Sequence, residues 1–337
     1  MRIAVVGTGA NGASIGADLT RAGLDVTFIE QWPAHVAAMR ADGVRIDMPD
    51  GSETTRVRVF DLCEVATLRE TFDVVLLLVK AYDTVWSLEL IKPLLAPDGV
   101  VVGMQNGMTI DAIASVVGPQ RTVGSVIEIA STMFDPGVVR RDTTRALTWY
   151  AIGAEDPVAA RRLDELAEVL RHSGRVEISA DIRSSKWMKL VANATELVPS
   201  AILDMTVMEA VEVPGMHEFM VEAGREAART AVALGHRLVP IFGLTEGEEL
   251  DPETFPEQLL AIVHDVFSVP GQMTTVLQDW VKGRRSEVDQ LNGLVVDEAR
   301  RLGRDAPVNA RVQSVARRIE AGGLERSPSN ASLLLEP

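Results

Sequence analysis

Gly7-Thr8-Gly9-Ala10-Asn11-Gly12 directly follows the apolar run Ile3-Ala4-Val5-Val6, which is typical of a strand buried on both faces of a parallel sheet. A helical pattern then ends at Gly23, and residues 24–29 predict a second strand, with Glu30 at its end. A strand, a G-x-G-x-x-G turn, a helix and a second strand that ends in an acid form the dinucleotide-binding fingerprint. The start of the chain therefore predicts a Rossmann-type fold.

Each part of the turn is expected to play a particular role in binding a nucleotide. The first glycine permits the tight turn, the second lets the backbone approach a pyrophosphate, and the third lets the helix pack on the strand. The phosphates then lie on the unpaired N–H groups at the start of the helix. We therefore expect the cofactor to bind at the six residues of the turn, which are Gly7, Thr8, Gly9, Ala10, Asn11 and Gly12.

The acid at position 30 bears on the choice of cofactor. A carboxylate at the end of the second strand accepts hydrogen bonds from the adenosine ribose hydroxyls and repels a 2′-phosphate. The neighbouring Gln31 and Trp32 offer no cation for that phosphate. Glu30 therefore favours NAD over NADP.

Composition limits the class of protein. The 337 residues suggest two domains, and a hydrophobic content of 47% suits a globular enzyme. The net charge of −15 disfavours binding to nucleic acid or to anionic membranes, and an anionic small-molecule substrate would need a locally basic pocket. The single Cys63 supplies neither an internal disulfide nor a cysteine cluster for zinc, and we find no metal-binding motif. The apolar amino terminus already forms the first strand, so we expect a cytoplasmic protein without a signal peptide.

The pattern along the chain divides it into three parts. Residues 1–180 alternate predicted strands and helices, residues 181–325 show helical periodicity alone, and residues 326–337 look like a loosely held tail. We therefore predict an α/β Rossmann-type dinucleotide-binding domain followed by an all-α carboxyl-terminal domain. Asp50-Gly51 separates residues 44–48 from residues 56–60 and predicts a hairpin insertion in the first domain.

Polar residues follow two further predicted strands. Lys80 comes after residues 74–79, and Asn106 comes after residues 100–104. Ligands of open parallel sheets bind outside the carboxyl ends of the strands. Together with Glu30, these residues predict one edge of a cofactor cleft.

The predicted helical domain holds candidates for the chemistry. Lys189 and Asn193 are four residues apart and share a helix face, where apolar neighbours would desolvate the ammonium. Lys186 reaches the same face, but we expect it to be solvated. Glu287 lies near a predicted helix start, where an acid often serves only as part of a cap.

These residues also carry a resemblance to the ketopantoate reductase (2-dehydropantoate 2-reductase) family, over nearly the whole chain. The matching blocks are the amino-terminal glycine turn, Val79-Lys80-Ala81-Tyr82-Asp83-Thr84, Gln105-Asn106-Gly107-Met108, Trp187-Met188-Lys189-Leu190 with Asn193, Leu277-Gln278-Asp279, and Glu287 with Asn292-Gly293. The resemblance implies a Rossmann domain, then an all-helical domain, with catalysis in the cleft between them.

The resemblance also implies roles for particular residues. Lys189 would be the general acid that protonates a ketone oxygen as hydride arrives from nicotinamide. Glu287 would position the substrate and the lysine, and Asn193 would bind a substrate hydroxyl. Thr275, which stands where the family commonly has serine, would hold the substrate carboxylate. The two rim residues after the strands, Lys80 and Asn106, would line the cofactor end of the cleft.

The chain departs from the family pattern at two places. Members typically have a second asparagine four residues after the first, followed by proline, but this chain has Leu197 and then Pro199. A helix turn shifted by this change would bring the Glu196 carboxylate into the cleft as a replacement partner for the substrate. Members that use NADP carry a basic or polar residue where this chain has Glu30-Gln31.

We therefore expect a nicotinamide-dependent oxidoreductase that acts on a 2-oxo acid or related ketone, or oxidises the corresponding alcohol. An opine-type dehydrogenase, which reduces imines, is one alternative. The other is a noncatalytic NAD(H)-sensing protein, which would not need the set of Lys189, Asn193 and Glu287. We expect a homodimer, because two-fold dimers are the commonest assemblies.

Overall fold

The computed structural model of the protein describes residues 1–242 and 250–336. Contacts within the chain divide it into two compact units, Met1–Arg183 (unit 1) and Ser184–Pro337 (unit 2). The boundary falls in the first turn of the long helix α7 (Ile182–Ile202).

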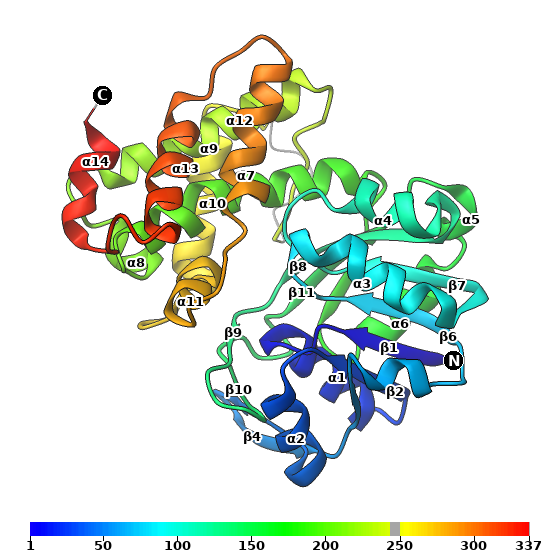
Figure 1. Ribbon diagram of the computed structural model, residues 1–337. Helices are drawn as coiled ribbons and strands as arrows, with labels where there is room; N and C mark the ends of the chain where they lie inside the picture. Colours follow the sequence, from blue (N-terminus) through cyan, green and yellow to red (C-terminus); the bar gives the residue numbers. More distant parts are fainter. Residues whose placement is uncertain (243–249, 337) are drawn as a thin grey trace. The chain divides into compact units, whose positions relative to one another are not determined.

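The main sheet of unit 1 has eight strands in the order β12-β11-β8-β7-β6-β1-β2-β5 (Figure 1). Its neighbouring strands are parallel, apart from β8 and β11, which are antiparallel. From β5 to β8 this is the doubly wound Rossmann order: strands after β1 are added first on one side, as β2 and β5, and then on the other, as β6, β7 and β8. The strands are β1 (Arg2–Val6), β2 (Asp25–Glu30), β5 (Arg58–Asp61), β6 (Phe72–Leu77), β7 (Leu95–Gly103), β8 (Thr122–Glu128), β11 (Trp149–Gly153) and β12 (Arg175–Ile178).

Both faces of this sheet are buried, which explains the continuous apolar runs of the sequence. Ile3 and Val5 point into one hydrophobic core, and Ala4 and Val6 point into the other. Successive side chains of a strand alternate between faces, so a strand covered on both sides needs apolar residues at every position. The first core includes residues of α1 (Ala10–Arg21), α2 (Pro33–Asp42), α5 (Pro157–Ala160) and α6 (Leu163–Leu170), and the second includes residues of α3 (Thr84–Ile91) and α4 (Ile110–Val117).

A second, four-stranded sheet has the order β4-β3-β10-β9 and contains the hairpin. Its strands are β3 (Val44–Met48), β4 (Gly51–Thr55), β9 (Ser131–Thr132) and β10 (Val138–Arg141). The prediction of residues 56–60 as the returning strand is wrong. Met48 pairs with Gly51, so the turn is only two residues long and the return starts at once. Arg58–Asp61 is instead β5, at the edge of the main sheet.

A buried ion pair fixes α1 to the segment around β10. The Asp18 carboxylate accepts hydrogen bonds from Arg141 Nη1 at 2.6 Å and from Ser173 Oγ at 2.8 Å. Burial raises the pKa of the nearby Tyr150 to about 12. Because α1 follows the glycine turn, this network holds the helix that the predicted cofactor site needs.

Unit 2 is helical. Helix α9 (Met216–Ala233) packs against α10 (Phe255–Ile262), α12 (Asn292–Arg301), α13 (Pro307–Glu320) and α14 (Ala331–Leu335) (Figure 1). The unit also contains α8 (Val207–Ala210), α11 (Thr275–Val281) and a π-helical turn, Val263–Phe267. Among the described residues, no helix has the length and hydropathy to cross a membrane.

Residues 326–337 were expected to be loosely held, but Asn330, Ala331 and Leu334 within this segment are buried. Leu334 on α14 is 0% exposed, and the Asn330 side chain donates a hydrogen bond to the carbonyl of Ile202 at 3.1 Å. Ala331 and Leu334 form the buried side of this short segment, whereas Leu335 is exposed, and the proline and serines before it misled the prediction.

Candidate active site

The glycine turn lies between β1 and α1 with the backbone geometry that the motif requires. Gly7 has φ +86°, and a Cβ atom there would lie 2.7 Å from the backbone nitrogen of Val79. A Cβ at Gly12 would lie 2.2 Å from the carbonyl oxygen of Gly7. At Gly9, by contrast, no atom of the described chain lies within 4 Å of an added Cβ. The open space thus adjoins the start of α1, where a pyrophosphate would meet the helix N–H groups.

Glu30 is 5% exposed and is held by the turn itself. Its Oε2 accepts a hydrogen bond from Thr8 Oγ1 at 2.9 Å, and its Oε1 accepts from the backbone N–H groups of Gln31 and Trp32, both at 2.9 Å. A carboxylate oxygen has room for about two hydrogen bonds. Oε2 can therefore accept one more, for example from a ribose hydroxyl, while Oε1 is fully used.

His35 supports the same turn from α2, although no sequence motif pointed to it. Gly137 N donates to His35 Nδ1 at 2.8 Å, so the ring proton lies on Nε2, which donates to the carbonyl oxygen of Thr8 at 3.0 Å. Burial lowers the pKa of His35, and the charge of Glu30 acts in the opposite direction. The neutral ring thus links the glycine turn to the segment before β10.

Lys80 and Asn106 lie beyond the carboxyl ends of the neighbouring strands β6 and β7, and both are half-buried. The buried Gln105 connects the two loops. Its Nε2 donates to the carbonyl oxygen of Val79 at 2.8 Å and to Thr84 Oγ1 at 2.9 Å. Lys80 and Asn106 therefore lie at the same edge of the sheet as the glycine turn and Glu30.

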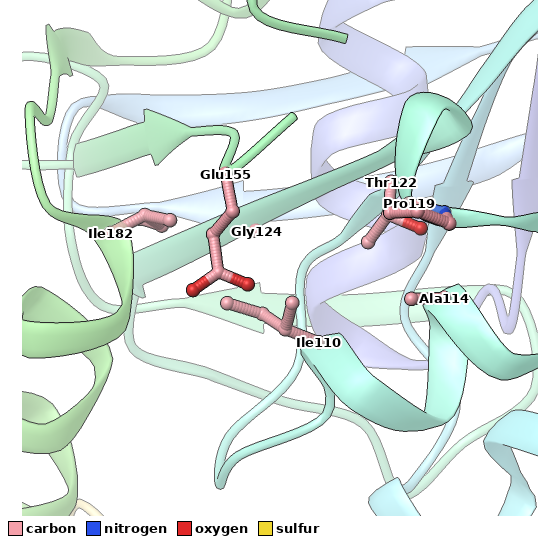
Figure 2. A pocket seen from close by; sticks show the side chains of 7 residues that line it. All are labelled: Ile110, Ala114, Pro119, Thr122, Gly124, Glu155 and Ile182. Carbon is pink, nitrogen blue, oxygen red and sulfur yellow. The ribbon is translucent and has the colours of Figure 1, made fainter. Parts of the chain in front are cut away.

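A small pocket of unit 1 lies elsewhere, and Figure 2 shows its lining residues. Its room of about 20 Å³ holds about one water molecule. Thr122 and Gly124 in its wall belong to the first half of β8, away from the carboxyl ends. The Glu155 carboxylate beside it is hydrogen-bonded to Arg183 at 2.6 Å. This pocket offers no room for a nucleotide.

In unit 2, α7 presents a polar stripe within an otherwise apolar helix. Lys186, Lys189, Asn193 and Glu196 follow one another at spacings of three, four and three residues, which places them on one face. Asn193 is 1% exposed, Lys186 and Glu196 are also buried, and Lys189 is half-buried. Three of the four residues were predicted to belong to the site.

The fourth residue of the stripe, Lys186, was expected to be solvated, but the structure shows that it is buried. It is 3% exposed, and burial lowers its pKa to about 8, while the charge of Glu287 acts to raise it. Glu287 is 4% exposed and precedes the short 3-10 helix Val288–Gln290. Within the described structure its side chain makes no capping hydrogen bond, so capping does not account for this acid. The negative charge of Glu287 interacts instead with the Lys186 ammonium.

A chain of buried amides holds the stripe in place. The Asn292 side chain donates to the carbonyl oxygen of Ala194 at 3.0 Å and to Asn309 Oδ1 at 2.9 Å. Asn309 in turn donates to the carboxylate of Glu226 at 2.8 Å, whose pKa is raised mainly by burial. These contacts connect α7, α12, α13 and α9 next to Asn193.

The two threonines at the start of α11, Thr274 and Thr275, have different surroundings. Thr274 caps the helix by accepting from Leu277 N, and its hydroxyl donates to the carbonyl oxygen of Leu197 at 3.1 Å. The buried Oγ1 of Thr275 has no hydrogen-bond partner among the described residues. Thr275 is thus the one of the pair whose hydroxyl remains available to a ligand.

Comparisons with known proteins match two successive parts of the chain to two sequence models. The sequence model described as "Ketopantoate reductase PanE/ApbA" matches residues 3–154, and "Ketopantoate reductase PanE/ApbA C terminal" matches residues 181–320. The chain belongs to the ketopantoate reductase family. Among curated members, the 2-dehydropantoate 2-reductase of Mesorhizobium japonicum is 28% identical, with 95% of this chain and 98% of the relative covered. That of Archaeoglobus fulgidus is 26% identical, with the same coverage.

Solved structures of other proteins have the same fold. A PanE/ApbA family ketopantoate reductase from Ralstonia eutropha has a TM-score of 0.80 at 29% identity, over 96% of this chain and 99% of that one. D-mandelate dehydrogenase bound to NADH and anilino(oxo)acetate has a TM-score of 0.85 at 21% identity, over the same shares, which shows the fold alone. Family membership makes the chain a nicotinamide-dependent oxidoreductase that acts between a ketone and an alcohol.

Proposed function

We propose that this family member transfers hydride between NAD(H) and the ketone carbon of a 2-oxo acid, with Lys189 as the general acid. The observation that carries the proposal is the polar stripe on α7. Lys189 and Asn193 share one largely buried face of this helix with Lys186, and the negative charge of Glu287 acts on Lys186. A ketone that gains negative charge needs a positioned proton donor, and this face supplies one.

The residues of unit 1 fit a dinucleotide. The open space at Gly9 suits a pyrophosphate, and the remaining acceptor site of Glu30 suits a ribose hydroxyl. Asp61 ends the neighbouring strand opposite Glu30, so a second carboxylate opposes a 2′-phosphate. These observations support NAD as the preferred cofactor. When bound, the nicotinamide supplies or accepts the hydride.

In the direction of reduction, the side chains of unit 2 act on the substrate. Lys189 donates a proton to the ketone oxygen while the ketone carbon gains the hydride, and the amine regains its proton from solvent. Thr275 Oγ1 donates to the substrate carboxylate, and Asn193 holds a hydroxyl or the ketone oxygen. Glu287 orients the lysine and the substrate. Lys186 adds a positive charge to a protein of net charge −15, which assists an anionic substrate.

We propose that ketopantoate is not the best substrate. Leu197 offers no polar atom where the family typically has a second amide, and an unpaired substrate hydroxyl costs about 1–3 kcal/mol. Glu196 is buried on the same helix and is the one acid of α7 able to replace that amide.

The test is kcat/KM with NADH for ketopantoate beside branched and aromatic 2-oxo acids, together with the reverse reaction on the corresponding alcohols. We expect a simple branched or aromatic acid to equal or exceed ketopantoate. A clear preference for ketopantoate would overturn this choice. A requirement for an amine co-substrate would favour imine reduction, and the absence of turnover with every ketone would favour the sensing role.

We further propose that the protein acts as a cytoplasmic homodimer. This rests on its composition and on the frequency of two-fold assemblies. Light scattering of the purified protein tests the assembly, and a monomer at all concentrations would contradict it.

A further inference from the structure

Phe242 has a backbone conformation that bulky residues rarely adopt. Its φ is +62°, and among the described residues only Asp204 is another non-glycine residue with positive φ. Aspartate tolerates this region because its short side chain hydrogen-bonds locally, whereas phenylalanine has no such compensation. Such an outlier persists only where the surroundings determine it, and it points to a function for the side chain.

The segment before Phe242 is fixed along the first turns of α7. The backbone N–H of Arg237 donates to Ser184 Oγ at 3.1 Å, and the ring of His236 stacks on Trp187 with centroids 5.5 Å apart. Ile241 is buried as well. These contacts hold the chain against the helix on which Lys189 lies.

A second element supports the ring of Phe242 itself. The ring packs against Phe267 with centroids 5.5 Å apart and planes at 56°. Phe267 ends the π-helical turn Val263–Phe267, a rare conformation that often marks functional sites. Phe242 is only 7% exposed as a result.

The ring meets the amino group of Lys189. Lys189 Nζ lies 4.8 Å from the centroid of the Phe242 ring, within the range of a cation–π contact. We propose that Phe242 is a positioning residue that holds the Lys189 ammonium in place for proton transfer. This inference rests on the role proposed above for Lys189.

The contact suits a proton donor in a partly buried site. The negative face of the ring attracts the charged ammonium and keeps water from that side. The ring is only a weak acceptor for N–H groups, so it holds the ammonium without competing strongly with a substrate oxygen for its protons.

The contact itself can be measured without turnover. The chain has five lysines, Lys80, Lys92, Lys186, Lys189 and Lys282, so lysine-selective 13C labelling gives few side-chain NMR signals. Loss of one signal in Lys189→Arg assigns Lys189. We expect its ε-proton signal to be shifted upfield by the ring, and Phe242→Leu to abolish that shift while Phe242→Tyr retains it. An unchanged Lys189 signal in Phe242→Leu would overturn the contact.

Kinetics then test the positioning role. We expect Phe242→Leu to lower kcat by about 3- to 30-fold, which corresponds to roughly 0.6–2 kcal/mol, with KM for NADH unchanged. Phe242→Tyr should stay within about twofold of wild type, because its ring face is preserved. The matched control is Phe219→Leu on α9, which removes a similarly buried ring and should leave kcat unchanged.

Wild-type kcat in Phe242→Leu, or equal losses in the leucine and tyrosine variants, would contradict the proposal. Phe242→Met gives a second ring-free side chain of similar size if the leucine variant does not fold. Full activity of Lys189→Ala would instead remove the proposed general acid, and the NMR measurement would still decide whether the contact exists.

Discussion

The surroundings of Lys186 and Lys189 differ, although the two lysines lie one helical turn apart on α7. Lys186 is buried in the field of Glu287, whereas Lys189 is half-buried beneath an aromatic ring. Sequence spacing alone placed both on one face but did not reveal this difference, because burial depends on which distant segments cover the helix. The resemblance to the family motif points to Lys189 as the general acid, and the geometry adds Lys186 as the lysine that interacts with Glu287.

Replacing Lys189 tests the general acid. Lys189→Ala should lower kcat by on the order of 10²–10⁴ with unchanged affinity for NADH, since only proton transfer is removed. Steady-state kinetics and a fluorescence titration with NADH measure the two quantities. Lys186→Met is the comparison, and a larger loss of kcat there would show that the wrong lysine had been chosen.

Replacing Lys186 should instead affect stability. Lys186→Met leaves the buried Glu287 carboxylate without this cation, and breaking a buried pair costs about 3 kcal/mol. Urea denaturation should show that loss in the free energy of unfolding. The double variant with Glu287→Gln should recover most of it, and a strictly additive double variant would mean that the two groups do not interact.

Gly9 offers a sharper test of the cofactor site than the other glycines of the turn. Gly9→Ala adds a methyl group where the described chain leaves open space, so the free protein should keep its melting temperature. The same methyl should exclude the pyrophosphate and weaken NADH binding strongly. Gly323→Ala, after α13 in unit 2, is the control, because the added methyl would lie 3.6 Å from its nearest neighbour, the carbonyl oxygen of Arg318. Tight NADH binding by Gly9→Ala would place the phosphates elsewhere.

Among the elements, the strands of the main sheet were the most predictable. Strands such as β1 and β6 are buried on both faces, so nearly every residue is apolar and the pattern has no other explanation. The return strand β4 was missed because Gly51–Thr55 is polar and lies at the edge of the second sheet, where no core selects its residues. Helix α14 was missed because a single buried turn is too short to show periodicity.

His35 connects three elements and should make stability depend on pH. Its folded pKa is lowered below the ordinary value of about 6.5, so the unfolded chain binds the proton first. The stabilisation is therefore fully present above pH 6.5 and is lost progressively as the pH falls below it. The free energy of unfolding should fall more steeply from pH 7.5 to 5 in the wild type than in His35→Gln. His172→Gln, at an exposed histidine, should keep the wild-type slope, and equal slopes in all three proteins would exclude this linkage.

At the scale of the whole molecule, the sequence predicted the two kinds of architecture but not the complete site. The change from alternating to helical patterns marks the neighbourhood of α7, since it depends only on local periodicity. His35 and Phe242 were not selected, because each acts through a contact with a residue distant in sequence. Contacts of this kind leave no periodic signal in a single chain.

Stability of the whole protein also reports the preferred cofactor without any turnover. A ligand that binds only the folded state stabilises it by RT ln(1 + [L]/Kd), which is about 2.7 kcal/mol at a hundredfold excess over Kd. Glu30 and Asp61 are paired residues at the ends of β2 and β5, so a 2′-phosphate would meet repulsion from two acids that a ribose hydroxyl does not. NADH should therefore raise the melting temperature more than NADPH at every concentration.

Glu30→Gln combined with Gln31→Arg should shift the preference toward NADPH by about 1–3 kcal/mol. Asp25→Asn removes an exposed charge from the opposite end of β2 and should leave the preference unchanged, and a larger shift with NADPH in the wild type would refute the assignment of Glu30.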